Sequence, residues 1–509
     1  MLSKVLSGGL FGINGLLIRV EVDLNRGLPA FDIVGLPDTA VRESRERVKS
    51  AIKNSGFDFP IKKIIINLAP ADIKKAGPHF DLSIAVGILA ASGIVKKDKL
   101  SKYIFLGELS LGGKVSSVKG VLPVVMEAKK RGFEGIVLAK ENIKEAALVG
   151  EIKVIGVSDL KQVVAFLNEN KIPELNKLDY NNTVESKENY EIDFAEIKGQ
   201  YEARRALEVA AAGAHNIILI GPPGSGKTML ARRVKTILPP LSREESLELT
   251  RIYSVMGILK NKNVLKRDRP FRAPHHSISS AGLIGGGRIP EPGEISLAHQ
   301  GILFLDEIPE FKRETLELLR QPLEEGNITI TRRSMTVTYP ANFMLIAAQN
   351  PCPCGYYGDD HHKCRCSVRQ ITTYRNKISG PLLDRIDIQI EVPPLVAKEI
   401  IGTNKGENST SIRERVMGAY NIQIERYQDE NIKFNSQLKG KKLRKYCVID
   451  RESTYLLQDA VESFGLSARG YDKILRMART IADLDKSKRI NYNHVAEAVQ
   501  YRELERNLN

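Results

Sequence analysis

The stretch Asn216–Val234, NIILIGPPGSGKTMLARRV, decides the fold class expected for the centre of this 509-residue chain. The apolar run IILI predicts a short buried strand, and KTMLARRV predicts a helix. Glycines between them would let backbone N–H groups converge on phosphate oxygens at the positive end of that helix. The stretch therefore predicts an ATP-binding loop, with a chance match in a turn as the alternative. The loop residues are Gly221, Pro222, Pro223, Gly224, Ser225, Gly226, Lys227 and Thr228, which satisfy G-x-x-x-x-G-K-[ST].

A second motif supplies acids for the same site. The apolar run GILFL ends in Asp306 and Glu307. We expect Lys227 to reach the β- and γ-phosphates, and Thr228 and Asp306 to hold Mg²⁺. Glu307 would polarise the attacking water. Adjacent acids also occur on protein surfaces, but the apolar run before them favours a buried strand, so the two motifs together predict ATP hydrolysis.

The flanking sequence predicts several domains. ILFLDE and NFMLIAAQN are further buried-strand runs, and such a series with helices between predicts a mainly parallel sheet of the α/β class. The polar stretch from Asn168 to Ile192 predicts a linker, and the charged helical sequence after Pro394 predicts a helical lid. The expected domains are an α+β domain at 1–167, a linker at 168–192, an ATPase core at 193–394 and a lid at 395–509.

Composition limits the class of protein and its partners. No run reaches the roughly 18–20 apolar residues that a membrane span needs, and the N-terminus does not resemble a cleaved signal. We expect a cytoplasmic protein without a membrane partner. The net charge of +15 favours polyanions such as nucleic acid, although a solvated basic surface would give the same total.

Longer runs around these motifs resemble one family. They are IKGQYEARRALEVAAAGAHNIILIGPPGSGKT, RPFRAPHHSISSAGLIGGGRIPEPGEISLAHQGILFLDEIPEF, SGPLLDRIDI and LSARGYDKILRMARTIADL. The sequence resembles the AAA+ superclass of magnesium chelatase and the MCM helicases, and most closely the ComM/YifB family of magnesium-chelatase-like proteins. Together with the N-terminal domain, the resemblance covers nearly the whole chain. It implies a phosphate-loop ATPase core with a helical lid, assembled as a homohexameric ring.

The resemblance also assigns three polar residues. Asn350, at the end of NFMLIAAQN, resembles the sensor that orients the hydrolytic water. Arg385, in LLDRID, resembles the finger that reaches the γ-phosphate of a neighbouring subunit, and Arg469, in SARGYDKIL, resembles the second sensor in the lid. Each could instead be an ordinary surface ion pair or hydrogen bond. A finger acting in trans requires an oligomer.

Two insertions offer arginines to a nucleic acid. The glycine-rich segment between the nucleotide motifs carries Arg288 at a predicted turn, and TITRRSMTVTY predicts a β-hairpin with Arg332 and Arg333 at its tip. In the resembling family such insertions face the pore of the ring. Arginines there would follow a phosphate backbone without reading bases, or would only build subunit contacts. The basic run Gly440–Lys445 is interpreted as a solvated loop.

Four of the five cysteines form a cluster directly after Asn350, with His361 and His362 between the two pairs. Four thiolates suit tetrahedral Zn²⁺. The C-x-C spacing departs from the more usual C-x-x-C of structural zinc sites, so unligated thiols are the alternative. The remaining cysteine, Cys447, is expected in the core. The cluster consists of Cys352, Cys354, Cys364 and Cys366.

The N-terminal domain resembles the Lon proteolytic domain, with an S5-like fold, through KKAGPHFDLSIAVGILAASG and FLGELSLGGKVSSVKGVLPVVMEAKKRGFEGIVLAKEN. Lon proteases use a serine activated by a lysine. The serine position falls on His79 and the lysine position on Leu122, while Ser83 and Lys119 lie near but not at those positions. We therefore expect no peptidase activity, and a role in assembly or in binding a partner or nucleic acid.

The resemblance and the positive charge favour a DNA-directed motor, a ComM-like branch-migration helicase that acts on branched or single-stranded DNA in natural transformation and homologous recombination. One alternative is a metal-insertion ATPase like magnesium chelatase, which needs separate partner subunits. Another is a nucleotide-switched protein remodeller or scaffold. ATP and Mg²⁺ are the cofactors expected in each case, with structural Zn²⁺ at the cysteine cluster.

Overall fold

The computed structural model describes residues 1–169, 171, 191–259, 264–287, 289–332, 335–359, 362–394 and 406–502. The chain divides into two compact units, the first made of residues 1–187 and 243–266 and the second of 188–242 and 267–509. Most of the expected linker, and the beginning of the expected lid, lie outside the described residues. Helix α5 (Leu160–Glu169) runs two residues into that linker.

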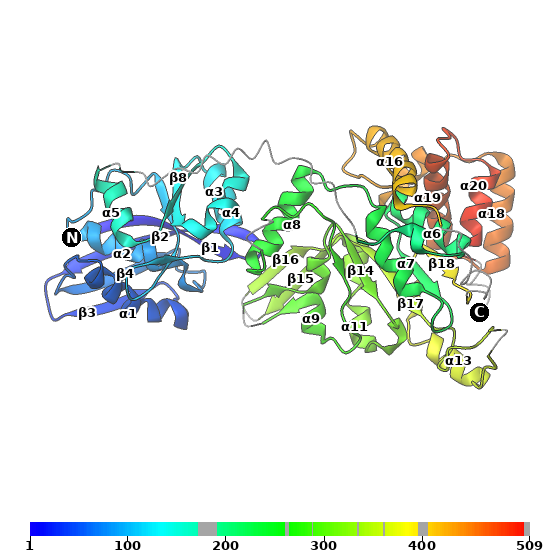
Figure 1. The fold of residues 1–509 in the computed structure, drawn as a ribbon, viewed down its shortest axis with the longest axis horizontal. Helices are drawn as coiled ribbons and strands as arrows, with labels where there is room; N and C mark the ends of the chain where they lie inside the picture. Colours follow the sequence, from blue (N-terminus) through cyan, green and yellow to red (C-terminus); the bar gives the residue numbers. More distant parts are fainter. Residues whose placement is uncertain are drawn as a thin grey trace. The chain divides into compact units, whose positions relative to one another are not determined.

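The first unit is built on a seven-stranded mixed sheet, in the order β3-β4-β2-β1-β5-β8-β9 (Figure 1). A long antiparallel hairpin of β1 and β2 stands at its centre, and β5, β8 and β9 extend it in parallel. The strands are β1 Leu2–Phe11, β2 Asn14–Asn25, β3 Ala30–Val34, β4 Lys63–Ala69, β5 Tyr103–Phe105, β8 Gly135–Ala139 and β9 Lys153–Val157, with a small separate hairpin of β6 Glu108–Leu109 and β7 Val115–Ser116.

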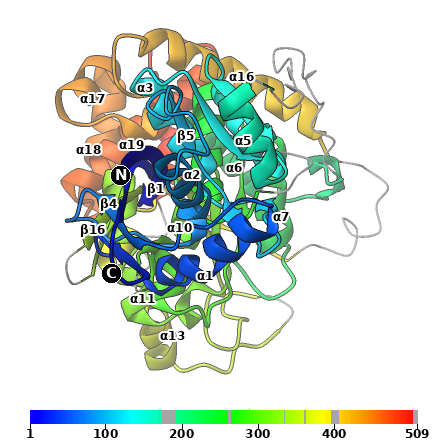
Figure 2. The same cartoon turned by 90° about the vertical axis from the view of Figure 1, so that its left-hand side faces the viewer.

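Alternate residues of these strands point into two separate cores, as the period of a strand requires. Val5 packs into the core that α1, α2 and α5 cover, whereas the next residue, Leu6, packs against the core of α3 and α4. Helix α2 is buried along its whole length and packs against α1 (Figure 2). The helices are α1 Thr39–Asn54, α2 Asp81–Ala91, α3 Val121–Lys130 and α4 Ile143–Ala146.

One further helix of the first unit comes from the middle of the ATPase sequence. Helix α8 (Arg243–Val255) packs against α3, and the Gly120 N–H donates to the Ser254 carbonyl at 3.0 Å. The Ser254 hydroxyl donates to the buried carboxylate of Glu145 at 2.5 Å. Residues 243–266 thus form an excursion of the chain into the first unit, which the continuous boundaries expected from the sequence do not include.

The second unit contains a five-stranded sheet in the order β11-β14-β17-β10-β18, and every neighbouring pair is parallel. The parallel α/β core expected from the sequence is confirmed. Phe304, Ile346 and Leu219 belong to one continuous apolar core that extends into the C-terminal helices. The strands are β10 Ile217–Ile220, β11 Phe271–Arg272, β14 Ile302–Leu305, β17 Met344–Gln349 and β18 Ile388–Glu391.

The C-terminal residues form the expected helical lid, in which α19 packs on both α16 and α20 (Figure 1). Ser467 caps α19 by accepting from the Gly470 N–H at 3.1 Å. The lid helices are α16 Ser409–Arg426, α17 Gly440–Tyr446, α18 Arg451–Phe464, α19 Ala468–Leu484 and α20 Tyr492–Gln500. The basic run expected as a loop is therefore helix α17. Among the described residues, no helix combines the length and the apolar character needed to cross a membrane.

Short helices and two hairpins complete the second unit. The hairpin expected around TITRRSMTVTY is present as β15 and β16. The helices are α6 Tyr201–Gly213, α7 Lys227–Arg233, α9 Ser280–Ile284, α10 Glu294–Leu297, α11 Arg313–Glu317, α12 Arg320–Glu325, α13 Val368–Arg375 and α14 Gly380–Leu383, and the hairpins are β12 Gly285–Gly286 with β13 Glu291–Pro292 and β15 Asn327–Arg332 with β16 Met335–Pro340.

Candidate nucleotide-binding site

Parallel strands bring the predicted nucleotide residues to one edge of the second sheet. Strand β10 leads into the loop 221–226, β14 ends before Asp306, and β17 ends before Asn350. Because β14, β17 and β10 are neighbours and run in the same direction, their carboxyl ends share one edge. The structure therefore gathers the loop, the acids and Asn350, as the sequence predicts.

The glycines of the loop have distinct structural reasons. Gly224 and Gly226 adopt φ angles of 78° and 89°, and a Cβ at either position would meet no atom within 4 Å. Their conformation, not crowding, requires glycine. Gly221 is different, because a Cβ there would lie 2.2 Å from the Val392 carbonyl oxygen. The space beside Gly224 and Gly226 is thus open at the beginning of α7, where an anion binds well.

Lys227 lies folded under this loop. Its ammonium donates to the carbonyls of Gly221 at 2.7 Å and Pro222 at 2.8 Å, and to the Asn350 side-chain oxygen at 3.3 Å. Burial lowers the pKa of Lys227 to about 8, although Asp306 and Glu307 favour its charged form. A phosphate would offer this ammonium stronger, charge-assisted partners than the carbonyls it now uses.

The two acids have different surroundings. Asp306 accepts from the Thr228 hydroxyl at 2.8 Å, so a carboxylate and a hydroxyl converge as oxygen ligands suited to Mg²⁺. Glu307 adopts a left-handed backbone conformation with φ of 50°, which is uncommon for a residue with a side chain and is found at functional sites. Its side chain is half exposed and lies 3.8 Å from the Nδ1 of His276. Sequence reasoning did not select His276, although it lies in the quoted run RPFRAPHHS.

The two arginines assigned by resemblance lie together, and both pair with acids outside the loop. Arg385 pairs with Glu324 of α12, and its Nη1 donates to the Pro381 carbonyl at 2.7 Å. Arg469, in α19, pairs with Asp384 at 3.4 Å. Within the described part of the chain, neither arginine pairs with a residue of the loop 221–228.

The two hairpins pack on each other beside the core. The Tyr339 hydroxyl donates to the Pro290 carbonyl at 2.6 Å, and the Ile330 side chain fills the space above Gly285. Arg332 is exposed at the end of β15, and a Cβ on Gly286 would lie 3.8 Å from its guanidinium. Two other arginines selected from the sequence for DNA, Arg288 and Arg333, lie outside the described residues.

The four clustered cysteines converge. The metal-ligating atoms of Cys352, Cys354, Cys364 and Cys366 all lie within 4.8 Å of one another. The sulfur of Cys352 is 3.4 Å from that of Cys354 and 3.7 Å from that of Cys364. Four sulfurs bound at about 2.3 Å to one tetrahedral zinc ion would lie about 3.8 Å apart. The donor set and its spacing therefore fit Zn²⁺. His362 contacts Asp359 and Tyr356 rather than the sulfurs, and His361 lies outside the described residues.

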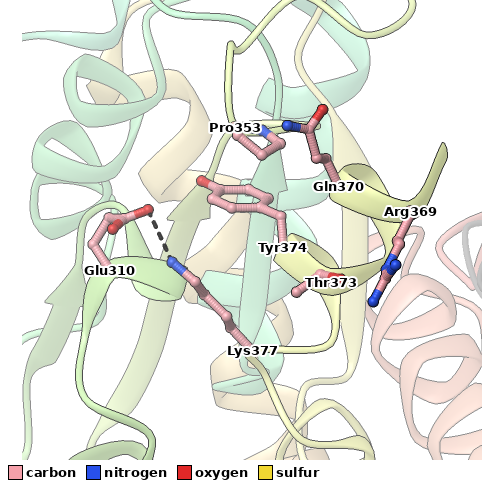
Figure 3. A pocket seen from close by; sticks show the side chains of 7 residues that line it. All are labelled: Glu310, Pro353, Arg369, Gln370, Thr373, Tyr374 and Lys377. Atoms are coloured by element: carbon pink, nitrogen blue, oxygen red, sulfur yellow. Dashed lines mark ion pairs between the residues drawn. The ribbon is translucent and has the colours of Figure 1, made fainter. Parts of the chain in front are cut away.

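The cysteine segment touches the phosphate-binding loop. A Cβ on Gly355 would lie 2.6 Å from the Pro223 ring, so the two segments are in close contact. A cavity of about 370 Å³ also lies beside Pro353 and helix α13, and an ion pair of Lys377 and Glu310 at 3.5 Å lines it (Figure 3).

The protease-like positions of the first unit are filled. His79 is buried, its Nε2 lies 2.9 Å from the Lys119 carbonyl, and burial lowers its pKa. The Ser83 hydroxyl donates to the Phe80 carbonyl at 2.8 Å at the beginning of α2. The Leu122 N–H donates to Glu145 at 2.9 Å, and burial raises the pKa of Glu145. This geometry is compatible with the expected absence of peptidase activity, which stays a prediction.

Comparison with known families gives three matches along the chain. Residues 193–400 match "Magnesium chelatase, subunit ChlI", residues 20–142 match "Subunit ChlI of Mg-chelatase", and residues 406–502 match "Magnesium chelatase, subunit ChlI C-terminal". The magnesium-chelatase 38 kDa subunit of Rhodobacter capsulatus is 24% identical over 174 residues, which cover 31% of this chain and 50% of that subunit. The similarity to a chelatase subunit is therefore partial.

Two relatives match over nearly their full length. YifB of Salmonella typhimurium is 44% identical over 500 residues, 97% of this chain and 96% of the relative. The competence protein ComM of Haemophilus influenzae is 43% identical over 507 residues, 99% of this chain and 98% of the relative. With the phosphate-binding loop and its acids in place, these matches confirm the resemblance seen in the sequence. The chain belongs to the ComM/YifB family of magnesium-chelatase-like AAA+ ATPases.

Proposed function

We propose that this chain is the subunit of a cytoplasmic homohexameric motor that uses ATP hydrolysis to move along branched or single-stranded DNA. Its role would be that of a branch-migration helicase in natural transformation and homologous recombination. The ring is supported by the partners of Arg385, which pairs with Glu324 and, among the residues that the structure describes, with no residue of this chain's own loop. A site that holds ATP but lacks its finger requires a neighbour to complete it.

Within one subunit, the described residues have separate roles in hydrolysis. Lys227 and the N–H groups of the loop bind the phosphates, and Thr228 with Asp306 would hold Mg²⁺, which neutralises charge that develops on the phosphate oxygens. Glu307 accepts a proton from the attacking water, for which its half-exposed side chain is accessible. Asn350, 3.3 Å from the Lys227 ammonium, orients that water. Arg385 of the adjacent subunit supplies positive charge at the transition state.

The DNA part of the proposal rests on charge and on the hairpins. The formal charge of +15 attracts a polyanion, and Arg332 is exposed at the end of β15. An arginine at the end of a hairpin suits contact with a phosphate backbone and carries no sequence information. The similarity to a competence protein supports DNA as the substrate.

We also propose that the cysteine cluster holds a structural Zn²⁺. The four sulfurs converge at distances suited to one tetrahedral ion, and they follow Asn350 directly in the chain. Zinc at this position would stiffen the segment that carries Asn350 and contacts Pro223. It would take no part in the chemical step.

The test measures ATP hydrolysis and strand displacement on three-way and four-way DNA junctions, with wild type and Glu307→Gln side by side. We expect junctions to stimulate wild-type hydrolysis, and Glu307→Gln to retain ATP and junction binding without displacing strands. Glu310→Gln is the matched control, since Glu310 is a nearby exposed acid paired with Lys377. Indifference to every junction would contradict the DNA proposal, and full displacement by Glu307→Gln would contradict the role of that acid.

A further inference from the structure

The segment Asp384–Asp387, which contains Arg385, has an unusual backbone environment. It forms the turn between α14 and β18, where no regular element supplies partners for its carbonyl groups. Each of its four carbonyls nevertheless accepts a hydrogen bond from a side chain. Side-chain caps of this density fix a loop that would otherwise sample several conformations.

The caps come mainly from the lid. Lys473 donates to the carbonyls of Asp384 and, at 3.1 Å, Ile386. Arg502, just beyond α20, donates to the carbonyls of Ile386 at 2.7 Å and Asp387 at 3.3 Å. Both side chains are almost completely buried, with 4% and 1% exposure. The lid therefore holds the turn on either side of Arg385.

The remaining hydrogen bond to a carbonyl of this turn comes from the residue that precedes β10. Asn216 donates from its side chain to the Arg385 carbonyl at 3.1 Å, and its own carbonyl accepts the N–H groups of Asp387 and Ile388. Asn216 precedes β10, the strand that leads to the phosphate-binding loop. The Arg385 backbone is thus fixed between the lid and the central strand.

Burying a cation at this position costs free energy, which the interactions of the cation must offset. Burial lowers the pKa of Lys473 to about 7, although Asp387 favours its charged form. An apolar residue would fill the same space without that cost. The ammonium does, however, satisfy two carbonyls that Met or Leu would leave without this partner, and so fixes where the turn lies.

We propose that Lys473 and Arg502 are positioning residues for Arg385, which make the placement of the finger depend on the seating of the lid. The inference rests on the proposed role of Arg385 in trans. Arg469 lies one helical turn before Lys473 on α19 and pairs with Asp384, so the same helix contacts the turn twice. A subunit whose lid shifts would then weaken hydrolysis in its neighbour, while its own loop stays intact.

The experiment mixes full-length variants in pairs and measures steady-state ATP hydrolysis. Lys473→Met has an intact loop and a misplaced finger, whereas Lys227→Ala has a placed finger and a defective loop. We expect Lys473→Met alone to lose about 10-fold to 100-fold in kcat with little change in ATP-analogue affinity, because the finger acts on the transition state. A mixture with Lys227→Ala should regain activity at about a quarter of the interfaces, where the two defects lie on opposite sides.

Three matched controls define the outcome. Lys488→Met removes an exposed lysine of the lid and should leave kcat unchanged. Lys473→Arg keeps the charge and should restore part of the lost rate. A mixture of Lys473→Met with Arg385→Ala should regain nothing, because both variants lack a working finger.

Two results would overturn the inference. The first is wild-type kcat in Lys473→Met while Arg385→Ala is inactive, which leaves the ring proposal standing. The second is a failure of Lys227→Ala to rescue Lys473→Met, with Arg502→Gln giving the same result, since a defect confined to the variant's own site cannot be complemented. If Lys473→Met does not fold, Arg502→Gln in the same mixtures decides the matter. Full activity of Arg385→Ala would instead remove the finger itself, and with it the proposed function.

Discussion

Helices α7 and α2 both begin after glycine-containing turns, which we call the open turn (residues 221–226) and the closed turn (residues 77–80), and the two turns differ in the space beside them. Before α7, Gly224 and Gly226 leave open space within 4 Å, and Lys227 is held by carbonyls that a phosphate can replace. Before α2, a Cβ on Gly77 would lie 2.8 Å from the His79 ring. The space beside the turn is therefore open before α7, whereas the His79 ring fills it before α2.

The largest effect should come from replacing the lysine of the open turn. Lys227→Met removes charge-assisted hydrogen bonds worth about 1.5–3 kcal/mol each, so we expect ATP affinity and hydrolysis to fall about 100-fold or more. Lys119→Met, beside the closed turn, is the matched control and should stay within about twofold of wild type. Calorimetric titration with an ATP analogue and an ATPase assay would measure both, and equal losses would remove the distinction between the turns.

Removal of Glu145, a buried acid of the first unit, should reduce stability rather than activity. Glu145 accepts from Leu122, Asn142 and Ser254, so Glu145→Ala leaves buried donors without a partner. We expect a loss of about 2–3 kcal/mol in the free energy of unfolding, with ATP affinity unchanged. Glu141→Ala, at an exposed position nearby, should change neither quantity. A wild-type denaturation midpoint for Glu145→Ala would show that these buried donors do not depend on the Glu145 carboxylate.

The same acid predicts a pH dependence of defined sign. The folded pKa of Glu145 is raised by burial, so its protonated form stabilises the fold below the unfolded pKa, and this contribution is lost as the pH rises through the folded value. Glu145→Gln cannot ionise. Its stability relative to wild type should therefore increase with pH from about 4 upward. Denaturant unfolding at a series of pH values would measure this, and a difference that falls or stays flat would contradict the burial of the charge.

The cysteine cluster provides a further test of the open turn, because Gly355 contacts Pro223 of that turn. We expect about one zinc per chain in the purified protein. Cys364→Ser should lose the metal and lower kcat several-fold, since the segment carrying Asn350 loosens, while Cys447→Ser, buried elsewhere in the lid, should keep it. Metal analysis with an ATPase assay would decide, and a zinc-free wild type with a fully stable Cys364→Ser would exclude the site.

The smallest effect should follow from restoring a serine to the closed turn. His79→Ser recreates the nucleophile position, but Leu122 still stands where the resemblance expects a lysine, and Ser83 remains bonded to Phe80. We expect no peptidase activity and no labelling by a serine-directed probe. Labelling of His79→Ser that is absent from wild type would show that the region still admits a ligand.

The sequence predicted which residues gather around the open turn, because each of them belongs to a local pattern. The loop residues are consecutive, each acid or sensor follows its own apolar strand, and the parallel sheet then brings them to one edge. Other features depend on pairs far apart in the chain, such as Ser254 with Glu145, 109 positions away, and Lys473 with Asp384, 89 positions away. No short motif marks such pairs, so the excursion of α8 and the caps around Arg385 were not predicted.

The excursion at 243–266 has a practical consequence for how this protein can be dissected. The chain passes from one unit to the other at 187/188, 242/243 and 266/267, so the units are joined by three covalent connections. A protease cut between 168 and 192 would leave two of them intact within the C-terminal fragment, and the N-terminal fragment would be held by its noncovalent packing against α8. A truncated protein that starts at residue 193 would also keep α8 but lose α3, against which α8 packs. The first unit is thus formed from two separate stretches of the chain, and its removal requires rebuilding the segment 243–266 as well.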